Sequence, residues 1–453
     1  MDRSVNRPLP EAFLNNMRNM LGDEYPAFLR ALDMPPALAL RLNPRREGAE
    51  AAAEAFIDGP VPWAAQGRYL KQEEGLRPGA AIAHAAGAYY LQEASAMASA
   101  AVLDARPGEQ ILDLCAAPGG KSTQITAALE GRGLLVSNDP EPARARALAG
   151  NLERMGAANA IVVSALPHKL ADLWPEYFDA VLVDAPCSGE GMFRRDPDSR
   201  AEWNPASPAG CAKRQAEILD RAARMLRPGG RLVYSTCTFN DLENEGSIRA
   251  FLDRNPEFSP EGFSLPGVGG SAEGMLRLLP HRVRGDGHFV AKLRKSDGKC
   301  SARREDAGRA RRDRDVTGYL ERLSGEVCRL PDFMADMAPL LQGDRLYLQP
   351  QGSPRLDGLR VISPGLCLLR IGRNHIEPEH ALAMALPPEF ALRRAELDED
   401  RAAAWLRGEA LPLEGEKGWT LVLHNGLPLG WGKASEGMLK NHLPKGLRRN
   451  GPA

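Results

Sequence analysis

The stretch Ile111-Leu-Asp-Leu-Cys-Ala-Ala-Pro-Gly-Gly-Lys-Ser-Thr123 decides the fold of this chain. The apolar run Ile111 to Leu114 predicts a short buried strand, and the turn at residues 117–120 ends it. Residues 121–130 then follow a helical pattern. A strand, a glycine turn and a helix in this order form nucleotide-type sites in open α/β sheets. The glycines let the backbone approach a ligand, and the first helical turn offers unpaired N–H groups.

Three classes of ligand compete for this turn. A phosphate-binding P-loop requires glycine five residues before Gly120, and Cys115 stands there instead. A dinucleotide site requires G-x-G-x-x-G, which the turn lacks. S-adenosylmethionine remains, and its ribose needs an acid at the end of the next strand. The predicted strand 134–138 leads directly to Asp139, which is well placed for ribose hydroxyls, although a strand-end turn residue is an equal alternative.

Composition limits the class of protein. At 453 residues the chain is expected to hold two to four domains, and 43% hydrophobic residues are ample for their cores. The formal net charge of −1 does not indicate nucleic-acid binding, so any basic surface must be local. Residues 292–314 carry a net charge of +6 and residues 431–453 one of +4. A solvated linker and a loose tail are the alternatives for these two segments.

The cysteines and the hydropathy predict a soluble protein of the reducing cytoplasm. None of the seven cysteines forms a CxxC pair, and we therefore expect free thiols. No signal peptide begins the chain, and no apolar run approaches 18 residues. No membrane partner is expected.

Strands and helices alternate between residues 111 and 294. This alternation predicts an α/β fold with a parallel, doubly wound, Rossmann-like sheet. Ligands of such sheets bind outside the carboxyl ends of the strands, so reactive residues at these ends are candidates for a site. The expected strands are 110–114, 134–138, 160–164, 179–184, 231–236 and 287–293, and the expected helices are 121–130, 141–155, 211–226 and 242–254.

Two cysteines follow consecutive strands of this unit. Cys187 follows the strand that ends at Asp184, and Cys237 follows the strand that ends at Thr236. Neighbouring strands lie about 4.8 Å apart, so both thiols can face one crevice. A disulfide is the rival interpretation, and the cytoplasm argues against it. No metal is expected, because zinc prefers four ligands and neither cysteine has a histidine beside it. We interpret cysteines 211, 300, 328 and 367 as small buried hydrophobes.

A pair of thiols beside a methyl donor points to one difficult reaction. Carbon 5 of cytosine is a poor nucleophile, but addition of a thiolate to carbon 6 makes the ring an enamine that can accept a methyl group. Lys121 or helix N-termini would favour the thiolate, because a free thiol has a pKa of about 8.5. Asp184 could hydrogen-bond ring nitrogen 3 and the exocyclic amine. A second residue would then assist release of the product.

The motifs Asp184-Ala-Pro-Cys-Ser-Gly-Glu-Gly191, Ser235-Thr-Cys-Thr-Phe-Asn240 and Cys115-Ala-Ala-Pro-Gly-Gly-Lys121 resemble the Nol/Nop/Sun family of RNA 5-methylcytosine methyltransferases. The resemblance covers residues 80–295. It implies that Cys237 is the nucleophile, that Cys187 assists release, and that Asp184 and Lys121 lie near the target base. It also implies contacts to S-adenosylmethionine from Cys115, Ala116, Ala117, Pro118, Gly119, Gly120, Lys121, Asp139 and Asp184.

Further features refine the resemblance. DNA methyltransferases use the Pro-Cys thiol, so the presence of both cysteines favours RNA and no DNA partner is expected. The family carries an acidic or amide residue after the third strand, whereas this chain has Val163-Ser-Ala-Leu166, and Ser164 or a main-chain amide is expected to substitute. The residues Asn240, Glu243 and Asn244 are interpreted as shaping the loop. Arg194, Arg195 and Trp203 either grip RNA or belong to an ordered loop with a core tryptophan.

The expected domains are a helical N-terminal cap at 1–80, the methyltransferase domain at 81–294, a basic linker at 295–315, an α+β module at 316–395 and a second module at 396–453. The last third resembles bacterial ribosomal RNA methyltransferases that end in a PUA-like RNA-binding domain, with residues 380–385 and 439–441 as the best matches. This implies 16S rRNA or the small ribosomal subunit as partner. Transfer RNA, another ribosomal site and an RNA-binding assembly factor without catalysis are the alternatives, and an oxidoreductase is disfavoured.

Overall fold

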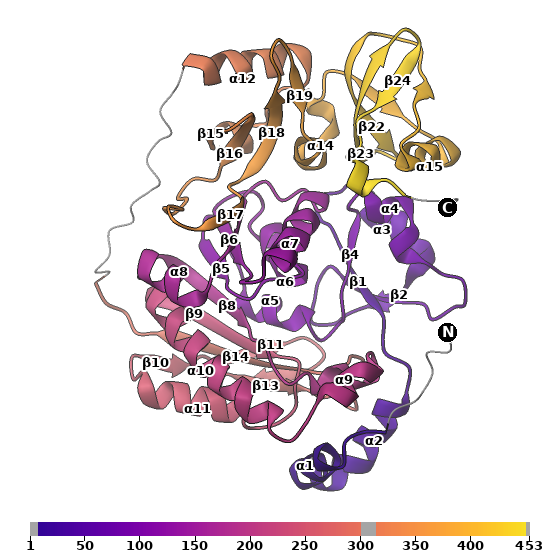
Figure 1. Ribbon diagram of the computed structural model, residues 1–453. Helices are drawn as coiled ribbons and strands as arrows, with labels where there is room; N and C mark the ends of the chain where they lie inside the picture. Colours follow the sequence, from indigo (N-terminus) through magenta and orange to yellow (C-terminus); the bar gives the residue numbers. More distant parts are fainter. Residues whose placement is uncertain (1–7, 300–313, 450–453) are drawn as a thin grey trace.

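The computed structural model describes residues 8–299 and 314–449. Its centre is a nine-stranded sheet with the order β10-β14-β9-β8-β5-β6-β7-β17, in which β13 also pairs with β14 (Figure 1). The strands are β5 (Gln110–Asp113), β6 (Leu134–Asn138), β7 (Ala160–Ser164), β8 (Phe178–Asp184), β9 (Leu226–Thr236), β10 (Phe258–Pro260), β13 (Met275–Leu278), β14 (His288–Lys295) and β17 (Arg360–Ser363).

The five central strands, β9-β8-β5-β6-β7, are parallel, and the strand order reverses at β5. A ligand crevice is expected at this reversal, and the turn that follows β5 begins there. The predicted doubly wound, Rossmann-like fold is therefore confirmed. Helices cover both faces: α5 (Met97–Leu103), α6 (Gly120–Ala128) and α7 (Pro142–Arg154) lie on one, and α8 (Pro167–Leu173), α10 (Ser207–Met225) and α11 (Glu245–Arg254) on the other.

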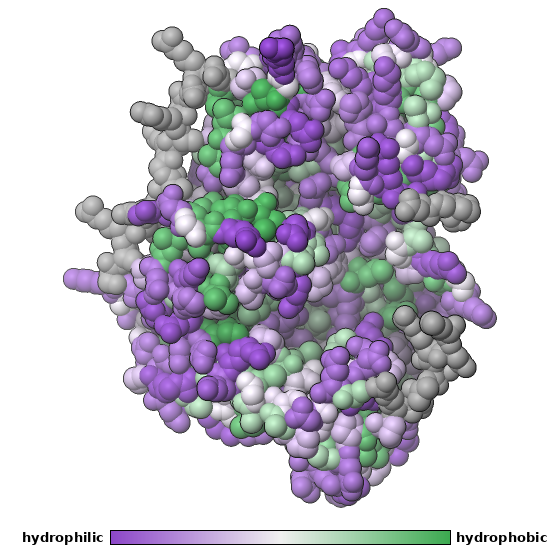
Figure 2. All heavy atoms as spheres, viewed as in Figure 1, coloured by the Kyte–Doolittle hydropathy of each residue, from purple (hydrophilic) through white to green (hydrophobic). Residues whose placement is uncertain are grey.

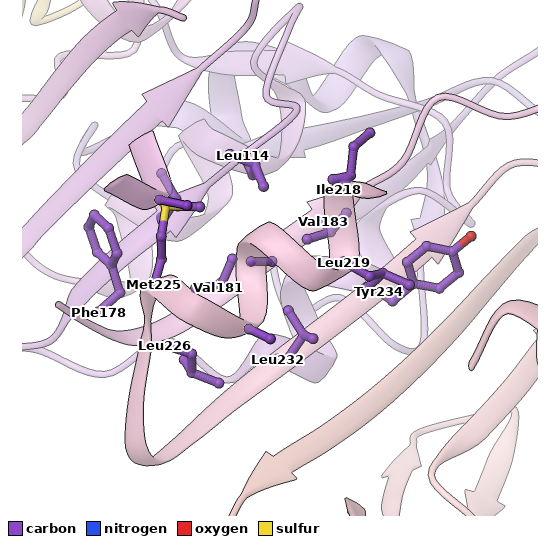
Figure 3. Close-up of a cluster of buried hydrophobic side chains, with 14 of the residues drawn as sticks. Leu114, Phe178, Val181, Val183, Ile218, Leu219, Met225, Leu226, Leu232 and Tyr234 are labelled. Atoms are coloured by element: carbon purple, nitrogen blue, oxygen red, sulfur yellow. The ribbon is translucent and has the colours of Figure 1, made fainter. Parts of the chain in front are cut away.

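The largest core cluster lies between the sheet and the second helical face. Leu219 of α10 packs against Val183 of β8 and Leu232 of β9, and all three are fully buried (Figure 3). The near-continuous apolar sequence of β8 follows from burial on both faces of the sheet. This packing fixes α10 behind the loops that leave β8 and β9.

Three elements of this unit differ from the prediction. The last predicted strand exists as β14, but it runs antiparallel to β9. Helix α8 was not expected, because its seven residues show little helical periodicity. They begin with a proline and are followed by a tryptophan and a second proline. Strand β17 comes from the C-terminal third and pairs antiparallel with the outer edge of β7, so that Arg360 stands opposite Ser164.

The N-terminal part is not the purely helical cap that we expected. It begins with α1 (Glu11–Leu21) and α2 (Tyr25–Asp33), but a four-stranded antiparallel sheet follows, with the order β2-β3-β1-β4. Its strand β4 pairs with β1, so this sheet continues past residue 80. The strands are too short to show an alternating pattern. They are β1 (Ala39–Leu42), β2 (Ile57–Pro60), β3 (Gly67–Leu70) and β4 (Tyr89–Leu91), with α3 (Ala49–Ala53) and α4 (Ile82–Ala85) between them.

The C-terminal third lies at the opposite end of the molecule from α1 and α2 (Figure 1). Its first sheet has the order β15-β16-β18-β19, and its second has the order β20-β22-β23-β24-β21. The elements are α12 (Arg314–Glu326), α13 (Asp332–Ala335), β15 (Ala338–Gln342), β16 (Arg345–Gln349), β18 (Leu366–Ile371), β19 (Ile376–Pro378), α14 (His380–Ala385), β20 (Arg394–Glu396), α15 (Glu399–Arg407), β21 (Leu411–Pro412), β22 (Gly418–His424), β23 (Leu427–Ser435) and β24 (Met438–Asn441). The module expected at 316–395 therefore contains the first of these sheets, and the module expected at 396–453 contains most of the second.

The two basic segments have different outcomes. Most of the segment 292–314 lies outside the described residues. The segment that begins at Trp431 is no loose tail as far as residue 449, because Trp431 and Leu439 are buried in β23 and β24. Hydrophilic residues dominate the face seen in Figure 2, and a group of hydrophobic residues lies near β17, where the C-terminal third meets the central sheet. Within the described ranges, no helix is long and apolar enough to cross a membrane.

Candidate active site

The turn after β5 forms a backbone cradle at the reversal of strand order. Gly119 has a φ of +115°, in the left-handed region that favours glycine, and a Cβ there would lie 3.1 Å from Leu148. Asn151 of α7 donates a hydrogen bond to the carbonyl oxygen of Pro118 over 2.9 Å. Helix α6 begins at Gly120, so its first N–H groups face this turn. The turn predicted from residues 115–121 is therefore a rigid loop with free backbone donors.

Asp139 lies at the carboxyl end of β6, as predicted. It is only 2% exposed, and its Oδ1 accepts a hydrogen bond from the backbone N–H of Glu141. Its Oδ2 lies 3.3 Å from the Arg144 guanidinium, which also donates to the carbonyl oxygen of Ala117. The carboxylate thus stands beside the glycine turn, at the distance one nucleoside sugar can bridge. The hydrogen bond to Glu141 is that of a strand-end turn, and the ribose contact of Asp139 stays a prediction.

A second buried carboxylate lies beneath the turn. Asp113, the last residue of β5, is fully buried, and its Oδ2 accepts a hydrogen bond from the hydroxyl of Ser122 over 2.7 Å. Its Oδ1 has no hydrogen-bond partner in the described part of the chain. Burial raises the pKa of this carboxyl to about 7, against the Ser122 hydrogen bond, which lowers it. The cofactor turn therefore rests on an acid that is partly protonated near neutral pH.

A cavity of about 320 Å³ continues the crevice beyond Asp139. Ser164 was expected to substitute for the acidic or amide residue that the family carries here. Its hydroxyl hydrogen is already used, because the hydroxyl donates to the carbonyl oxygen of Pro140. Its oxygen can still accept a hydrogen bond. The walls combine small apolar and polar groups, as an adenine ring requires: Pro140, Pro142, Ser164, Ala165, Leu166, Lys169, Gly358, Leu359 and Arg360. The cradle, the buried acid and this cavity together fit S-adenosylmethionine.

The two predicted thiols meet at the carboxyl ends of β8 and β9. Sγ of Cys187 lies 3.3 Å from Sγ of Cys237, and both thiols are free. The hydrogen bond with Cys237 raises the pKa of Cys187 well above its ordinary value, and burial adds to this effect. Cys187 therefore keeps its proton and can donate it toward the sulfur of Cys237. The prediction that adjacent strands bring these residues into one crevice is confirmed.

Lys121 and Asp184 form an ion pair beside the thiols. Nζ of Lys121 lies 2.7 Å from Oδ2 of Asp184, and the hydroxyl of Ser235 donates to Oδ1 over 2.7 Å. Burial alone would raise the pKa of Asp184, but Lys121 and then His288 outweigh it and hold this pKa well below its usual range. The ion pair also raises the pKa of Lys121 against the effect of burial. Both groups are therefore charged at neutral pH.

Two buried glutamates pin the loops that carry the cysteines. Glu243 accepts hydrogen bonds from the backbone N–H and the hydroxyl of Ser188 and from the side chains of Gln215 and Asn240. Glu190 accepts from the hydroxyl of Thr238 and from two backbone N–H groups after it. These contacts tie the loop after β8 to the loop after β9. The interpretation that Asn240, Glu243 and Asn244 shape the loop agrees with this network.

One residue beside the reacting groups was missed. His288 is buried, with a side chain 3% exposed, and its Nε2 lies 3.5 Å from Oδ1 of Asp184. We expected reactive residues at the carboxyl ends of strands, but β14 is antiparallel and brings its first residue to this edge. The sequence signal was a histidine directly after Gly285-Asp-Gly287 at the start of the last predicted strand.

The residues that we considered for gripping RNA are held by contacts within the protein. Arg194 and Arg195 both form ion pairs with the buried Asp286. Trp203 is 7% exposed and packs edge-on against Phe13 and Phe193. The alternative of an ordered loop with a core tryptophan is therefore correct, and these side chains fasten α1 and α2 to the catalytic unit.

The fold, the glycine turn and the acid after the second strand define an S-adenosylmethionine-dependent methyltransferase. Four family models match successive parts of the chain. They describe the N-terminal domain of 16S rRNA methyltransferase RsmF (residues 9–94), the 16S rRNA methyltransferase RsmB/F (100–294), the first C-terminal domain of RsmF (324–386) and the RsmF PUA domain (393–449). The chain belongs to the ribosomal RNA small subunit methyltransferase F family, which confirms the resemblance drawn from its motifs.

Relatives of this name match along the whole chain. Those of Escherichia coli strain K12 and Escherichia fergusonii are 32% identical over 471 aligned positions, covering 98% of this chain and 97% of theirs. Among solved structures, a methyltransferase homologue from Pyrococcus horikoshii is 29% identical, with a TM-score of 0.54, and covers 63% of this chain and 95% of that one. NSun6 from the same organism, at 22% identity and a TM-score of 0.56, covers 64% and 99% and shows the same fold.

Proposed function

We propose that this protein methylates carbon 5 of cytosine in small-subunit (16S) ribosomal RNA through a covalent adduct between Cys237 and carbon 6. The observation that carries the proposal is the pair of thiols 3.3 Å apart beside the Lys121–Asp184 ion pair. S-adenosylmethionine supplies the electrophilic methyl group. The alternatives are the same chemistry on transfer RNA or another ribosomal site, and an RNA-binding assembly factor without catalysis.

In the proposed reaction, the thiolate of Cys237 adds to carbon 6 and breaks the ring double bond to carbon 5, so that carbon 5 becomes nucleophilic. The ionised Asp184 accepts a hydrogen bond from the exocyclic amine and orients the ring. Lys121, which contacts Oδ2 of this carboxylate, keeps Asp184 ionised and adds positive charge near the sulfur. Both effects lower the barrier to addition by positioning and electrostatics.

After the methyl group has moved to carbon 5, the proton on carbon 5 passes to solvent. The electron pair of that C–H bond re-forms the ring double bond while the carbon–sulfur bond breaks. The pKa of Cys187 lies well above its ordinary value, because its thiol is bonded to Cys237 and buried. A protonated Cys187 therefore stabilises the departing thiolate by a hydrogen bond along the same 3.3 Å contact. We therefore propose that Cys237 attacks the base and that Cys187 assists release.

The substrate and setting follow from the relatives and the modules. Curated relatives are named ribosomal RNA small subunit methyltransferases, and the match at 393–449 is to a PUA domain. We infer that the C-terminal module binds RNA and that the protein acts in the cytoplasm. In the part of the chain that the structure describes, the cysteines are free, in keeping with reducing conditions.

The test is methyl transfer from labelled S-adenosylmethionine to three acceptors: unmodified small ribosomal subunits, naked 16S rRNA and transfer RNA. The product is digested, and the labelled nucleotide is identified and mapped. Labelled 5-methylcytosine in ribosomal RNA is the expected result. Label in transfer RNA alone would support the first alternative. No incorporation, with the cofactor still bound, would support the assembly factor.

A further inference from the structure

His288 is a buried histidine beside the reacting groups to which the proposed mechanism gives no role. Phe289 stands opposite Thr236 in the antiparallel pairing of β14 with β9, so His288 comes next, level with Cys237. Its side chain is 3% exposed, and its Nε2 lies 3.5 Å from Oδ1 of Asp184. The imidazole therefore reaches the same carboxylate as Lys121 and Ser235.

This nitrogen has only a long contact to the carboxylate. It is buried and forms no hydrogen bond of good geometry among the described residues, although Asp184 lies close enough for His288 to lower the pKa of its carboxyl. A buried polar atom that lacks a good hydrogen bond destabilises the folded protein, so such an atom near a reactive group calls for an explanation. The nitrogen is about 0.6 Å beyond the usual N–H···O distance from Oδ1. Hydrogen bonds of catalytic groups are often long before substrate binds and tighten in the complex.

We propose that His288 is a positioning residue that donates a hydrogen bond from Nε2 to Oδ1 of Asp184 in the substrate complex, and so fixes the carboxylate against the exocyclic amine of the target base. This inference rests on the proposed cytosine methylation.

Counting the acceptor sites of Asp184 shows why a third donor is useful. An ionised carboxylate has about four lone-pair sites. Lys121 takes one on Oδ2 and Ser235 takes one on Oδ1. With these two donors alone, the base could approach along either remaining site. His288 fills the second site on Oδ1, which leaves one direction for the base and one orientation of its ring toward Cys237.

The test compares His288→Phe and His288→Gln in the full chain. Phenylalanine keeps the ring and removes the donor, whereas glutamine places an amide N–H at a similar reach. We expect His288→Phe to slow single-turnover methylation about 10- to 100-fold, as a misplaced reacting group does. Binding of S-adenosylmethionine should change less than about twofold, and His288→Gln should recover most of the rate. His380→Phe is the matched control, because its Nδ1 is also buried without a hydrogen-bond partner, but far from Asp184.

A double-mutant cycle tests whether His288 acts through Asp184. In an Asp184→Asn background, His288→Phe should cause almost no further loss of rate. Three outcomes would each overturn the inference. They are full activity of His288→Phe, equal losses of rate for the phenylalanine and glutamine variants, and losses of rate that multiply in the double mutant. If one of these outcomes is found and the wild-type protein still makes 5-methylcytosine, the proposed function remains intact. A wild-type protein that makes none overturns both.

Discussion

Asp113 should make the folded protein less stable as the pH rises from about 4 to 7. Its pKa is raised by burial from its ordinary value of 3.8 to about 7, so the folded protein holds a proton that the unfolded chain releases. Because the folded state binds more protons over this interval, its stability falls with increasing pH. The shift corresponds to about 4 kcal/mol of unfolding free energy. The whole of this amount is lost only at pH values above the pKa of Asp113 in the folded protein.

Asp113→Asn removes this titration and keeps the shape of the side chain. Its amide N–H replaces an oxygen without a partner, at a cost of about 1–3 kcal/mol that does not depend on pH. The assay is urea unfolding of both proteins at pH 5, 6, 7 and 8. The free energy of unfolding of the variant should rise relative to that of the wild type by about 1.4 kcal/mol per pH unit until about pH 7. Above that pH the difference should stay constant. Asp172→Asn, at an exposed ion pair of α8, is the control. A constant difference between wild type and Asp113→Asn at all four pH values would refute the argument.

The remaining predictions concern the thiols, the ribose acid and the N-terminal helices. Cys237→Ala should abolish methyl transfer while the unfolding midpoint and cofactor binding stay unchanged; residual turnover would remove it as the nucleophile. Cys187→Ala should accumulate a protein–RNA adduct, seen as a slow band on a denaturing gel, and accumulation in Cys237→Ala instead would exchange the two roles. Asp139→Asn should weaken S-adenosylmethionine binding about 10- to 100-fold by calorimetry, because a hydrogen bond to a charged group contributes about 1.5–3 kcal/mol; unchanged affinity would contradict the ribose contact. Phe13→Ala should lower the unfolding free energy by about 3–5 kcal/mol, because Phe13 is 1% exposed and meets Phe193 edge-on; a loss below 1 kcal/mol would mean that α1 contributes little.

Sequence patterns predicted the parallel core because its information is local. The strand at β8 is a nearly continuous apolar run, and the turn after β5 contains a glycine with a positive φ. The meeting of Cys187 and Cys237 followed from strand adjacency alone. Sequence could place these residues at one edge because every parallel strand ends on the same side.

What the sequence did not predict depends on pairing between distant segments. Strand β17 is four residues long and carries no sign that it will pair with β7. The antiparallel direction of β14 brought His288 to the site from the start of a strand. The basic pair Arg194 and Arg195 looked like an RNA contact in the sequence, but both side chains form ion pairs with Asp286, some 90 positions away. Charges at such separations are paired by the tertiary fold, which periodicity does not report.

Strand β17 also decides how this protein can be divided. The match at 100–294 looks like a unit that could be expressed alone, but cutting there would strip β7 of its outer partner and open a row of unpaired backbone groups at residues 160–164. Such a bare edge is a template for chain-to-chain association. The indole N–H of Trp174 and the hydroxyl of Tyr177 would lose their carbonyl acceptors at Arg355 and Gly352 as well. A shortened version would therefore aggregate unless it kept the arm around residues 350–363, so a soluble catalytic fragment has to be assembled from two separate stretches of the gene.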